Sequence, residues 1–415
     1  MLRPLRRTLV YFLPLLALPA FAQKPLSWEE VRERFRSNNP SLLAGETFVD
    51  ENRANEVTAG LRPNPQLAFT VDQWKLFSGD PYRPLGAAQS IAQVSQLIER
   101  RNKRGLRVES AKLATSISGT DLADLERQLL FALRDAFVRT LQSKSILELA
   151  EENLRAYDKV IDISRKRFDA GDMSRSDFDR IGLQRAQFES DLANAMVNLR
   201  TAKIQVLALL NDKTPVDNFE LAGAFDFGDK ILLPEELHQA ALDARGDVRS
   251  ATTAMKKAET DNRLAWANGS TDPIVGADYT RIGPDNTVGL ALTIPLRIYD
   301  KNQGEKARTA LEIRRTEQAR EAILAGVNRD IDSAYAAVES VRTLLRPYRD
   351  RYLPQAERVR ESVSYAYSKG GATLLDFLDA QKSYRDAQLT YRNLIATYLS
   401  AVNQLNLAVG REVLQ

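Results

Sequence analysis

Two segments, 168–178 (FDAGDMSRSDF) and 367–377 (YSKGGATLLDF), share the pattern that decides the fold of this chain. Each has an aromatic residue three positions before a glycine, a Ser or Thr three positions after it, and an Asp-Phe pair beyond that. Glycine commonly ends a helix in the left-handed conformation, and Ser or Thr can cap the next helix. Both segments therefore predict a sharp turn between two helices. The predicted turn residues are Gly171, Ser174, Gly370 and Thr373.

The two turns belong to a repeat with an offset of 199 residues, the separation of Gly171 and Gly370. The same offset relates Asp177 to Asp376, Phe168 to Tyr367, Gly105 to Gly304 and Leu97 to Leu296. Closer to the N-terminus the offset drifts, which indicates loops of different length. A shared offset over such distant positions indicates a tandem duplication. We predict a first structural repeat at 23–212, a linker at 213–232 and a second repeat at 233–415.

Each half contains an unusually long helical stretch, 97–168 in the first and 306–367 in the second. The few helix breakers in or beside them are Gly105, Gly119, Gly326, Pro347 and Pro354. At 1.5 Å per residue, a helix of roughly 70 residues would extend on the order of 100 Å. Alternating steps of three and four residues separate Leu147, Ala150, Leu154, Tyr157, Ile161, Ser164 and Phe168. Such a stripe predicts coiled-coil packing.

Each half also contains two strand-like segments. Residues 66–74 and 287–294 alternate between apolar and small or polar side chains, whereas their partners at 88–96 and 273–281 alternate less clearly. A strand with this period of two can face lipid on one side and water on the other. A strand of a water-soluble sheet would show the same alternation.

The first 22 residues have the features of a secretory signal peptide. Arg3, Arg6 and Arg7 form a basic start, 9–18 is an apolar core, and Ala-Phe-Ala at 20–22 fits a cleavage site. We therefore expect export, and the alternative of a membrane anchor is weaker because the apolar run is short. No cysteine is present, so no lipid-attachment cysteine follows the signal.

The charge balance and residue types argue against several other functions. Without the three arginines of the signal, the 58 basic residues fall to 55, which equals the 55 acidic residues. This balance does not support a nucleic-acid-binding face. His238 is the only histidine and cysteine is absent, so the sequence offers no histidine-based metal cluster and no cysteine nucleophile. We predict neither an enzyme nor a bound cofactor or metal.

Two strands in each half give four per chain, and a membrane barrel needs about eight. Open sheet edges in hydrocarbon would leave backbone groups unpaired, at several kcal/mol each. Membrane insertion would therefore require several chains, and three would supply twelve strands. The predicted fold class is mainly α with a small β part: a long α-helical coiled-coil barrel plus four transmembrane strands per chain. The alternative is a periplasmic coiled-coil scaffold or adaptor, which explains the helices but not the strands.

The two turn segments resemble the helix tips of the TolC family of outer-membrane efflux proteins. The NPQL sequence at 64–67 and the IPL sequence at 294–296 also agree with that family, and the resemblance covers essentially the whole mature chain. It implies a homotrimeric exit duct in the outer membrane that extends into the periplasm and contacts outer-membrane lipid. It also implies two partners, a periplasmic adaptor and an inner-membrane pump of the resistance-nodulation-division type or an ABC transporter. Short members without a lipid anchor, which serve heavy-metal or drug pumps, are the most similar in character.

The resemblance also implies a periplasmic aperture near the second turn. Asp376 and Asp379 match the carboxylates of the constriction, while Asp177 and Tyr367 match members of the gating network. The family's arginine, two residues after the second tip glycine, is Ala372 here, and the sequence offers Arg175 or Lys369 instead. Rings of carboxylates favour cations, and crowding raises some of their pKa values. The alternative is that these acids simply stabilise the first turn of a helix.

Overall fold

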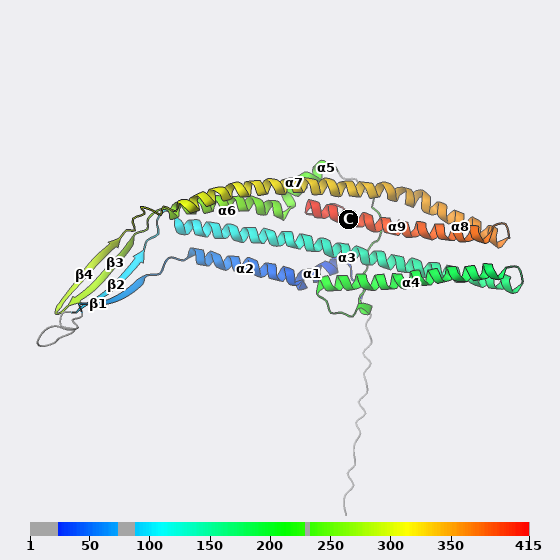
Figure 1. Cartoon of the computed structure of the whole chain (residues 1–415), viewed down its shortest axis with the longest axis horizontal. Helices are drawn as coiled ribbons and strands as arrows, with labels where there is room; N and C mark the ends of the chain where they lie inside the picture. Colours follow the sequence, from blue (N-terminus) through cyan, green and yellow to red (C-terminus); the bar gives the residue numbers. More distant parts are fainter. Residues whose placement is uncertain (1–23, 74–87, 229–232, 415) are drawn as a thin grey trace, which may run out of the picture.

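The protein is a long, gently curved rod with a small sheet at one end and helical turns at the other (Figure 1). This computed structural model describes residues 24–73, 88–228 and 233–414. The predicted signal at 1–22, and Trp74 at the end of the first predicted strand, lie outside the described residues. Among the residues described, no helix is both long and apolar enough to cross a membrane.

The two halves of the chain contain the same series of elements. The first half comprises α1 (Trp28–Asn38), α2 (Pro40–Gly60), β1 (Gln66–Asp72), β2 (Gln89–Leu97), α3 (Lys103–Asp169) and α4 (Arg175–Leu210). A 3-10 turn, η1 (Val216–Asn218), follows. The second half comprises α5 (Pro234–Ala244), α6 (Gly246–Asn268), β3 (Ile274–Ile282), β4 (Asp285–Thr293), α7 (Gln303–Pro347), α8 (Leu353–Ser368) and α9 (Leu374–Val409). The predicted order of elements is confirmed.

Both long helices differ in detail from the prediction. Helix α3 begins at Lys103 rather than near 97, because Leu97 still pairs with Ile274 in the sheet. The stretch predicted as one helix at 306–367 is divided by a π-helical turn, η2 (Tyr348–Tyr352). Pro347 and Pro354 flank this turn, and a proline removes a backbone donor and displaces the carbonyl four residues earlier. The helical hydrogen-bond pattern therefore shifts locally, as it does at π-bulges.

Two shorter helices lie in line beside each long helix (Figure 1). Helices α2 and α4 both pack against α3, and α6 and α9 both pack against α7. Contacts of α3 with α6 and α9 join the two halves. The rod is therefore a layer of helices in which pairs of half-length helices match the length of one long helix.

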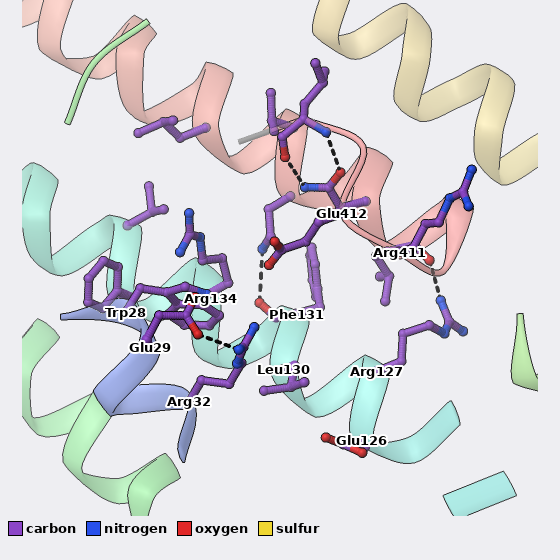
Figure 2. A pocket seen from close by; sticks show the side chains of 18 of the residues that line it. Trp28, Glu29, Arg32, Glu126, Arg127, Leu130, Phe131, Arg134, Arg411 and Glu412 are labelled. Atoms are coloured by element: carbon purple, nitrogen blue, oxygen red, sulfur yellow. Dashed lines mark hydrogen bonds and ion pairs between the residues drawn. The ribbon is translucent and has the colours of Figure 1, made fainter. Parts of the chain in front are cut away.

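The apolar core is concentrated where the half-length helices meet. Val31 and Phe35 of α1 are fully buried against Leu133 of α3. The segment after α4 joins this core through Phe219 and Leu221, and Leu221 forms a parallel bridge with Leu26. Beside this cluster, α1, α3 and the C-terminal end of α9 surround a cavity (Figure 2).

Asn39 joins the end of α4 to the start of α2. Its side-chain oxygen accepts hydrogen bonds from the backbone N–H groups of Ser41 and Leu42, at 3.0 and 3.2 Å. Its side-chain nitrogen donates to the carbonyl of Leu209 at 3.1 Å. One side-chain amide therefore pairs with a backbone carbonyl at one helix end and with backbone N–H groups at the other, which would otherwise lack hydrogen-bond partners.

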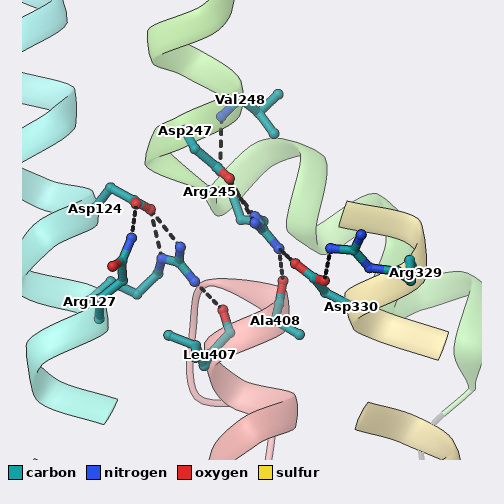
Figure 3. A network of polar contacts seen from close by, with 10 residues as sticks. Asp124, Arg127, Arg245, Asp247, Val248, Arg329, Asp330, Leu407 and Ala408 are labelled. Carbon is teal, nitrogen blue, oxygen red and sulfur yellow. Dashed lines mark hydrogen bonds and ion pairs between the residues drawn. The ribbon is translucent and has the colours of Figure 1, made fainter. Parts of the chain in front are cut away.

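Arg245 makes the equivalent joint in the second half, where α9 meets α6 (Figure 3). Its guanidinium donates to the carbonyl of Ala408 at 3.1 Å, and Ala408 lies 199 residues after Leu209. It also pairs with Asp247 at 2.7 Å and Asp330 at 3.3 Å. The guanidinium of Arg245 therefore lies at the negative, C-terminal end of the α9 dipole. Arg127 of α3 adds a second guanidinium there, because it donates to the carbonyl of Leu407.

The charges at this joint stabilise one another. Burial disfavours the charged form of Arg245, but its bonds to Asp247 and Asp330 outweigh burial and raise its pKa. Burial alone would raise the pKa of Asp247, yet Arg245 holds it below the ordinary value of 3.8. Removal of the arginine would leave Asp330 with Arg329 and Asp247 with the N–H of Val248 as their remaining donors. The loss of one partner from a largely buried ion pair is costly.

We predict that Arg245→Ala lowers the free energy of unfolding by about 2–4 kcal/mol. Arg53→Ala is the matched control, because Arg53 and its partner Asp50 are each 67% exposed, and we expect it to change stability by less than about 0.5 kcal/mol. Urea unfolding of the purified protein, followed by circular dichroism, measures both. Equal midpoints for the two variants would contradict a structural role for the joint.

Candidate functional site at the two ends of the rod

One face of the four-stranded antiparallel sheet is apolar and exposed. The strand order is β1-β2-β3-β4, and in one row Leu67, Val94, Ala277 and Leu290 lie side by side. The next row contains Phe69, Ala92, Tyr279 and Val288. Leu290 is 89% exposed and Phe69 75% exposed, although such side chains are usually buried. An exposed apolar patch of this kind indicates a surface that meets lipid or another protein.

The opposite face of the sheet carries mainly small and polar side chains. One row contains Ala68, Gln93, Asp278 and Gly289, and the next contains Thr70, Ile91, Thr280 and Thr287. The two faces together match the pattern of a membrane strand, with apolar residues toward lipid and polar residues toward water. The predicted strands are therefore confirmed, with starts within two residues of the prediction.

Within the part of the chain that the structure describes, the sheet ends in two edges that pair with no further strand. Strands β1 and β4 are the outer strands of the order β1-β2-β3-β4. In hydrocarbon the free N–H and C=O groups of these edges would each cost several kcal/mol. A membrane location therefore requires strands from neighbouring copies to pair with both edges.

We predict that Leu290→Lys strongly reduces the amount of protein in the outer membrane, because a lysine on the lipid face costs about 2–4 kcal/mol near the middle of the bilayer. Thr287→Lys is the matched control on the same strand, since Thr287 lies on the polar face. The measurement is the protein that remains in outer-membrane fractions after urea extraction. The assignment of the two faces fails if Thr287→Lys is lost from the membrane as completely as Leu290→Lys.

At the opposite end of the rod, both predicted turns close their helices in the same way. Gly171 has φ of +80° and Gly370 has φ of +76°, a conformation that glycine adopts without strain. Beyond the first glycine, the N–H of Asp172 bonds the carbonyl of Arg167 at 2.9 Å. Beyond the second, the N–H of Gly371 bonds the carbonyl of Ala366 at 2.8 Å. These are Schellman motifs, which satisfy the last carbonyls of a helix.

The returning helices start at the predicted caps. The hydroxyl of Ser174 accepts from the N–H of Asp177 at 3.1 Å, and that of Thr373 accepts from the N–H of Asp376 at 3.2 Å. The Asp376 carboxylate in turn accepts from the backbone N–H and the hydroxyl of Thr373, at 3.0 and 2.6 Å. These two bonds lower the pKa of Asp376 below its ordinary value of 3.8. Asp379, one helical turn further on, is exposed.

Tyr367 lies at the centre of a small cluster that joins the two turns. Its ring stacks on Phe377, with centroids 4.8 Å apart. The guanidinium of Arg167 lies 5.1 Å from the centre of the same ring. Burial raises the pKa of Tyr367, the charge of Arg167 opposes this, and the charge of Asp177 adds to it. Asp177 is near enough for its charge to act on the Tyr367 hydroxyl, and the gating role of the two residues stays a prediction.

Arg167 is the member of this cluster that the sequence analysis missed. One of its guanidinium nitrogens, Nη1, is buried and has no hydrogen-bond partner among the described residues. The residue 199 positions later, in the second repeat, is Ala366. This difference between the two repeats was the only sequence signal that could have identified Arg167. The two substitutes suggested by sequence lie elsewhere: Arg175 pairs with Asp179 at 3.2 Å, and Lys369 lies 5.8 Å from the ring of Tyr365.

Apolar packing also joins the two turns. Tyr157, Ile181 and Phe188 form a buried cluster in the α3–α4 hairpin, and Leu374 from the start of α9 packs against it. The rings of Tyr157 and Phe188 are 4.7 Å apart. The two helical hairpins therefore form one unit at the end of the rod.

The chain matches one family of known sequences over most of its length. The sequence pattern of the family described as outer membrane efflux protein matches residues 31–212 and 237–411. The chain belongs to this family. It is therefore an outer-membrane efflux channel of tripartite efflux systems that extends into the periplasm, and not an enzyme. Channels of this family are trimeric and work with efflux pumps.

Individual members of the outer membrane efflux protein family agree over most of the chain. The cobalt-zinc-cadmium resistance protein CzcC of Cupriavidus metallidurans is 25% identical over 383 residues, covering 88% of this chain and 85% of the relative. The outer membrane efflux protein BepC of Brucella suis is 24% identical over 370 residues, covering 84% and 77%. Both matches favour the channel over the periplasmic scaffold.

Solved structures show the same fold at low sequence identity. CusC has a TM-score of 0.78 at 16% identity, covering 97% of this chain and 99% of that one. The outer-membrane channel OprN has a TM-score of 0.76 at 15% identity, covering 92% and 89%. The MtrE channel of Neisseria gonorrhoeae has a TM-score of 0.76 at 17% identity, covering 93% and 89%.

Proposed function

We propose that the helix turns form the closable periplasmic entrance of this efflux channel. Asp376 and Asp379 would supply a cation-selective ring, and Asp177, Tyr367 and Arg167 would hold the entrance closed. The observation that carries this proposal is the cluster around Tyr367, in which one aromatic ring from the second turn meets a cation of the first turn. Such a cross-hairpin contact has to change if the two hairpins move apart.

The exposure and position of the two carboxylates support a selective ring. Asp376 and Asp379 are exposed at the start of α9, beside the turn that ends the rod. Three copies around an opening would place six negative charges within about one helical turn, and such rings favour cations. Hydrogen bonds from Thr373 favour the charged form of Asp376, whereas crowding in the ring would oppose it.

We further propose that the channel receives its substrate from a periplasmic adaptor and an inner-membrane pump of the resistance-nodulation-division type, with an ABC transporter as the alternative partner. Divalent metal cations are the substrate class that we favour. One relative, CzcC, is described as a cobalt-zinc-cadmium resistance protein. A carboxylate-lined entrance would attract such ions, since oppositely charged clefts raise the local concentration of a substrate.

If Asp376 and Asp379 form this ring, removal of their charges reduces the cation selectivity of the channel. In single-channel recordings across a salt gradient, we expect Asp379→Asn to shift the reversal potential toward zero and the double variant with Asp376→Asn to shift it further. Asp379→Asn leaves the cap between Thr373 and Asp376 intact. Asp50→Asn, an exposed carboxylate on α2, is the control. Unchanged cation preference in the double variant would exclude the proposed ring.

The closing contact is tested separately. Arg167→Ala removes a cation–aromatic contact worth about 1 kcal/mol, so we expect the ratio of open to closed channels to rise roughly fivefold. Arg165→Ala is the control, because Arg165 is exposed two residues earlier on the same helix. The open fraction in single-channel recordings measures the effect. An open fraction that is equal in both variants would show that Arg167 does not hold the entrance closed.

A further inference from the structure

A cavity of about 550 Å³ lies between α1, α3 and the C-terminal part of α9 (Figure 2). Pockets for small molecules typically measure about 300–1,000 Å³. Helix α1 and the C-terminal end of α9, which line this cavity, lie near the middle of the rod, away from both the sheet and the helix turns (Figure 1). It therefore belongs to neither of the functional ends described above.

The last described residues of the chain form one wall of this cavity. After α9 the chain reverses at Gly410, where φ is +84°, and the following segment folds back on the helix. The side chain of Asn406 holds it there. Its oxygen accepts from the N–H groups of Val413 and Leu414 at 2.8 and 3.1 Å, and its nitrogen donates to the carbonyl of Leu414 at 2.7 Å. The wall is therefore anchored by three hydrogen bonds.

The lining combines an apolar part with an excess of positive charge. Five arginines and three glutamates line the cavity: Arg32, Arg36, Arg127, Arg134, Arg411, Glu29, Glu126 and Glu412. Three of these arginines have partners within the protein. Arg32 pairs with Glu29, and Arg36 pairs with Glu126 at 2.6 Å. Arg127 is held by Asp124 and by a backbone carbonyl.

Arg134 is the exception among the arginines that are partly buried here. Its guanidinium lies 4.5 Å from the centre of the Trp28 ring and 5.8 Å from that of the Phe137 ring, and no hydrogen bond or ion pair joins it to another described residue. Burial lowers the pKa of Arg134, and the charges of Glu412 and Glu29 only partly oppose this. Arg134 is half-buried, so its guanidinium, which has five N–H donors, reaches the open space of the cavity and can donate to a bound acceptor.

Two further donors on the same wall lack acceptors. The indole nitrogen of Trp28 and Nε of Arg32 are buried and have no hydrogen-bond partner among the described residues. Both side chains line the cavity with Arg134. Because buried polar groups in proteins are nearly always paired, two such donors beside the half-buried guanidinium of Arg134 indicate a missing acceptor.

We propose that this cavity binds a small amphipathic anion, with one carboxylate or phosphate group attached to an apolar body. The acidic group accepts hydrogen bonds from Arg134, where the indole of Trp28 holds the guanidinium by cation–π contact. The apolar body packs against Leu130, Phe131 and Val402, which line the same cavity. Bound ligand would bridge α1, α3 and α9 at the level where the half-length helices meet.

The proposal is tested with the purified channel in a neutral detergent and water-soluble probes. Saturation-transfer NMR compares 4-phenylbutyrate with its alcohol and its amine, which have the same apolar body but no negative charge. Phenyl phosphate distinguishes a preference for phosphate esters from one for carboxylates. We expect the two anions to bind at least about tenfold more tightly than the alcohol, the amine or inorganic phosphate. Equal binding of the amine, or equal binding of inorganic phosphate, would overturn the proposal.

Variants connect the binding to the cavity. Arg134→Gln is expected to weaken binding of 4-phenylbutyrate by about tenfold or more, the loss of one charge-assisted hydrogen bond. Arg139→Gln, an exposed arginine of α3 paired with Asp135, is the control and should bind normally. Ala123→Trp places a large side chain on an exposed lining position and should abolish binding even if Arg134→Gln does not assemble. Normal binding to Ala123→Trp would show that the anion binds elsewhere.

Discussion

The architecture depends on hydrogen bonds that join one helix end to the next. A half-length helix in the middle of a rod leaves four carbonyls and four N–H groups without helical partners. Asn39 satisfies groups of both kinds at the junction of α4 with α2. Arg245 does so for the carbonyl end of α9, where it meets α6. Because the ends are closed in this way, two short helices can run in line beside one long helix.

The two joints use different chemistry at equivalent positions. Leu209 and Ala408 are 199 residues apart, yet a neutral amide bonds the first and a guanidinium bonds the second. The charged joint requires Asp247 and Asp330, since a buried cation without carboxylates would be unstable. Duplication has therefore kept the position of the joint while the two copies diverged in how they close it. The same divergence is present at the turns, where Arg167 has Ala366 as its counterpart.

Function is divided between the two ends of the rod. At one end, a sheet with one apolar and one polar face, open at both edges, needs copies of itself to enclose a passage through lipid. At the other end, aromatic and charged side chains bring two hairpins together around Tyr367. The long helices carry little chemistry of their own. They set the distance between the membrane and the point at which a partner can deliver substrate.

Patterns among residues close together in the sequence predicted the strands, the helix turns and the helix caps. The strands follow from alternation, the turns from glycine, and the caps from Ser174 and Thr373, because each of these signals depends on residues close together in sequence. The predicted start of α3 was several residues too early, because Leu97 pairs in the sheet with Ile274, which lies far along the chain. The π-helical turn at η2 was missed as well, although its flanking prolines were recognised as breakers.

The sequence by itself determined the duplicated order of helices and strands, the two turns and the family resemblance, since these depend on spacing along the chain. Only the tertiary structure decided which side chains from distant segments meet. Arg167 lies over Tyr367, Arg245 closes the end of α9, and Arg134 is left without an acceptor beside Trp28. Spacing cannot identify such groups, because burial and the loss of water, not residue type, determine whether an arginine has a partner.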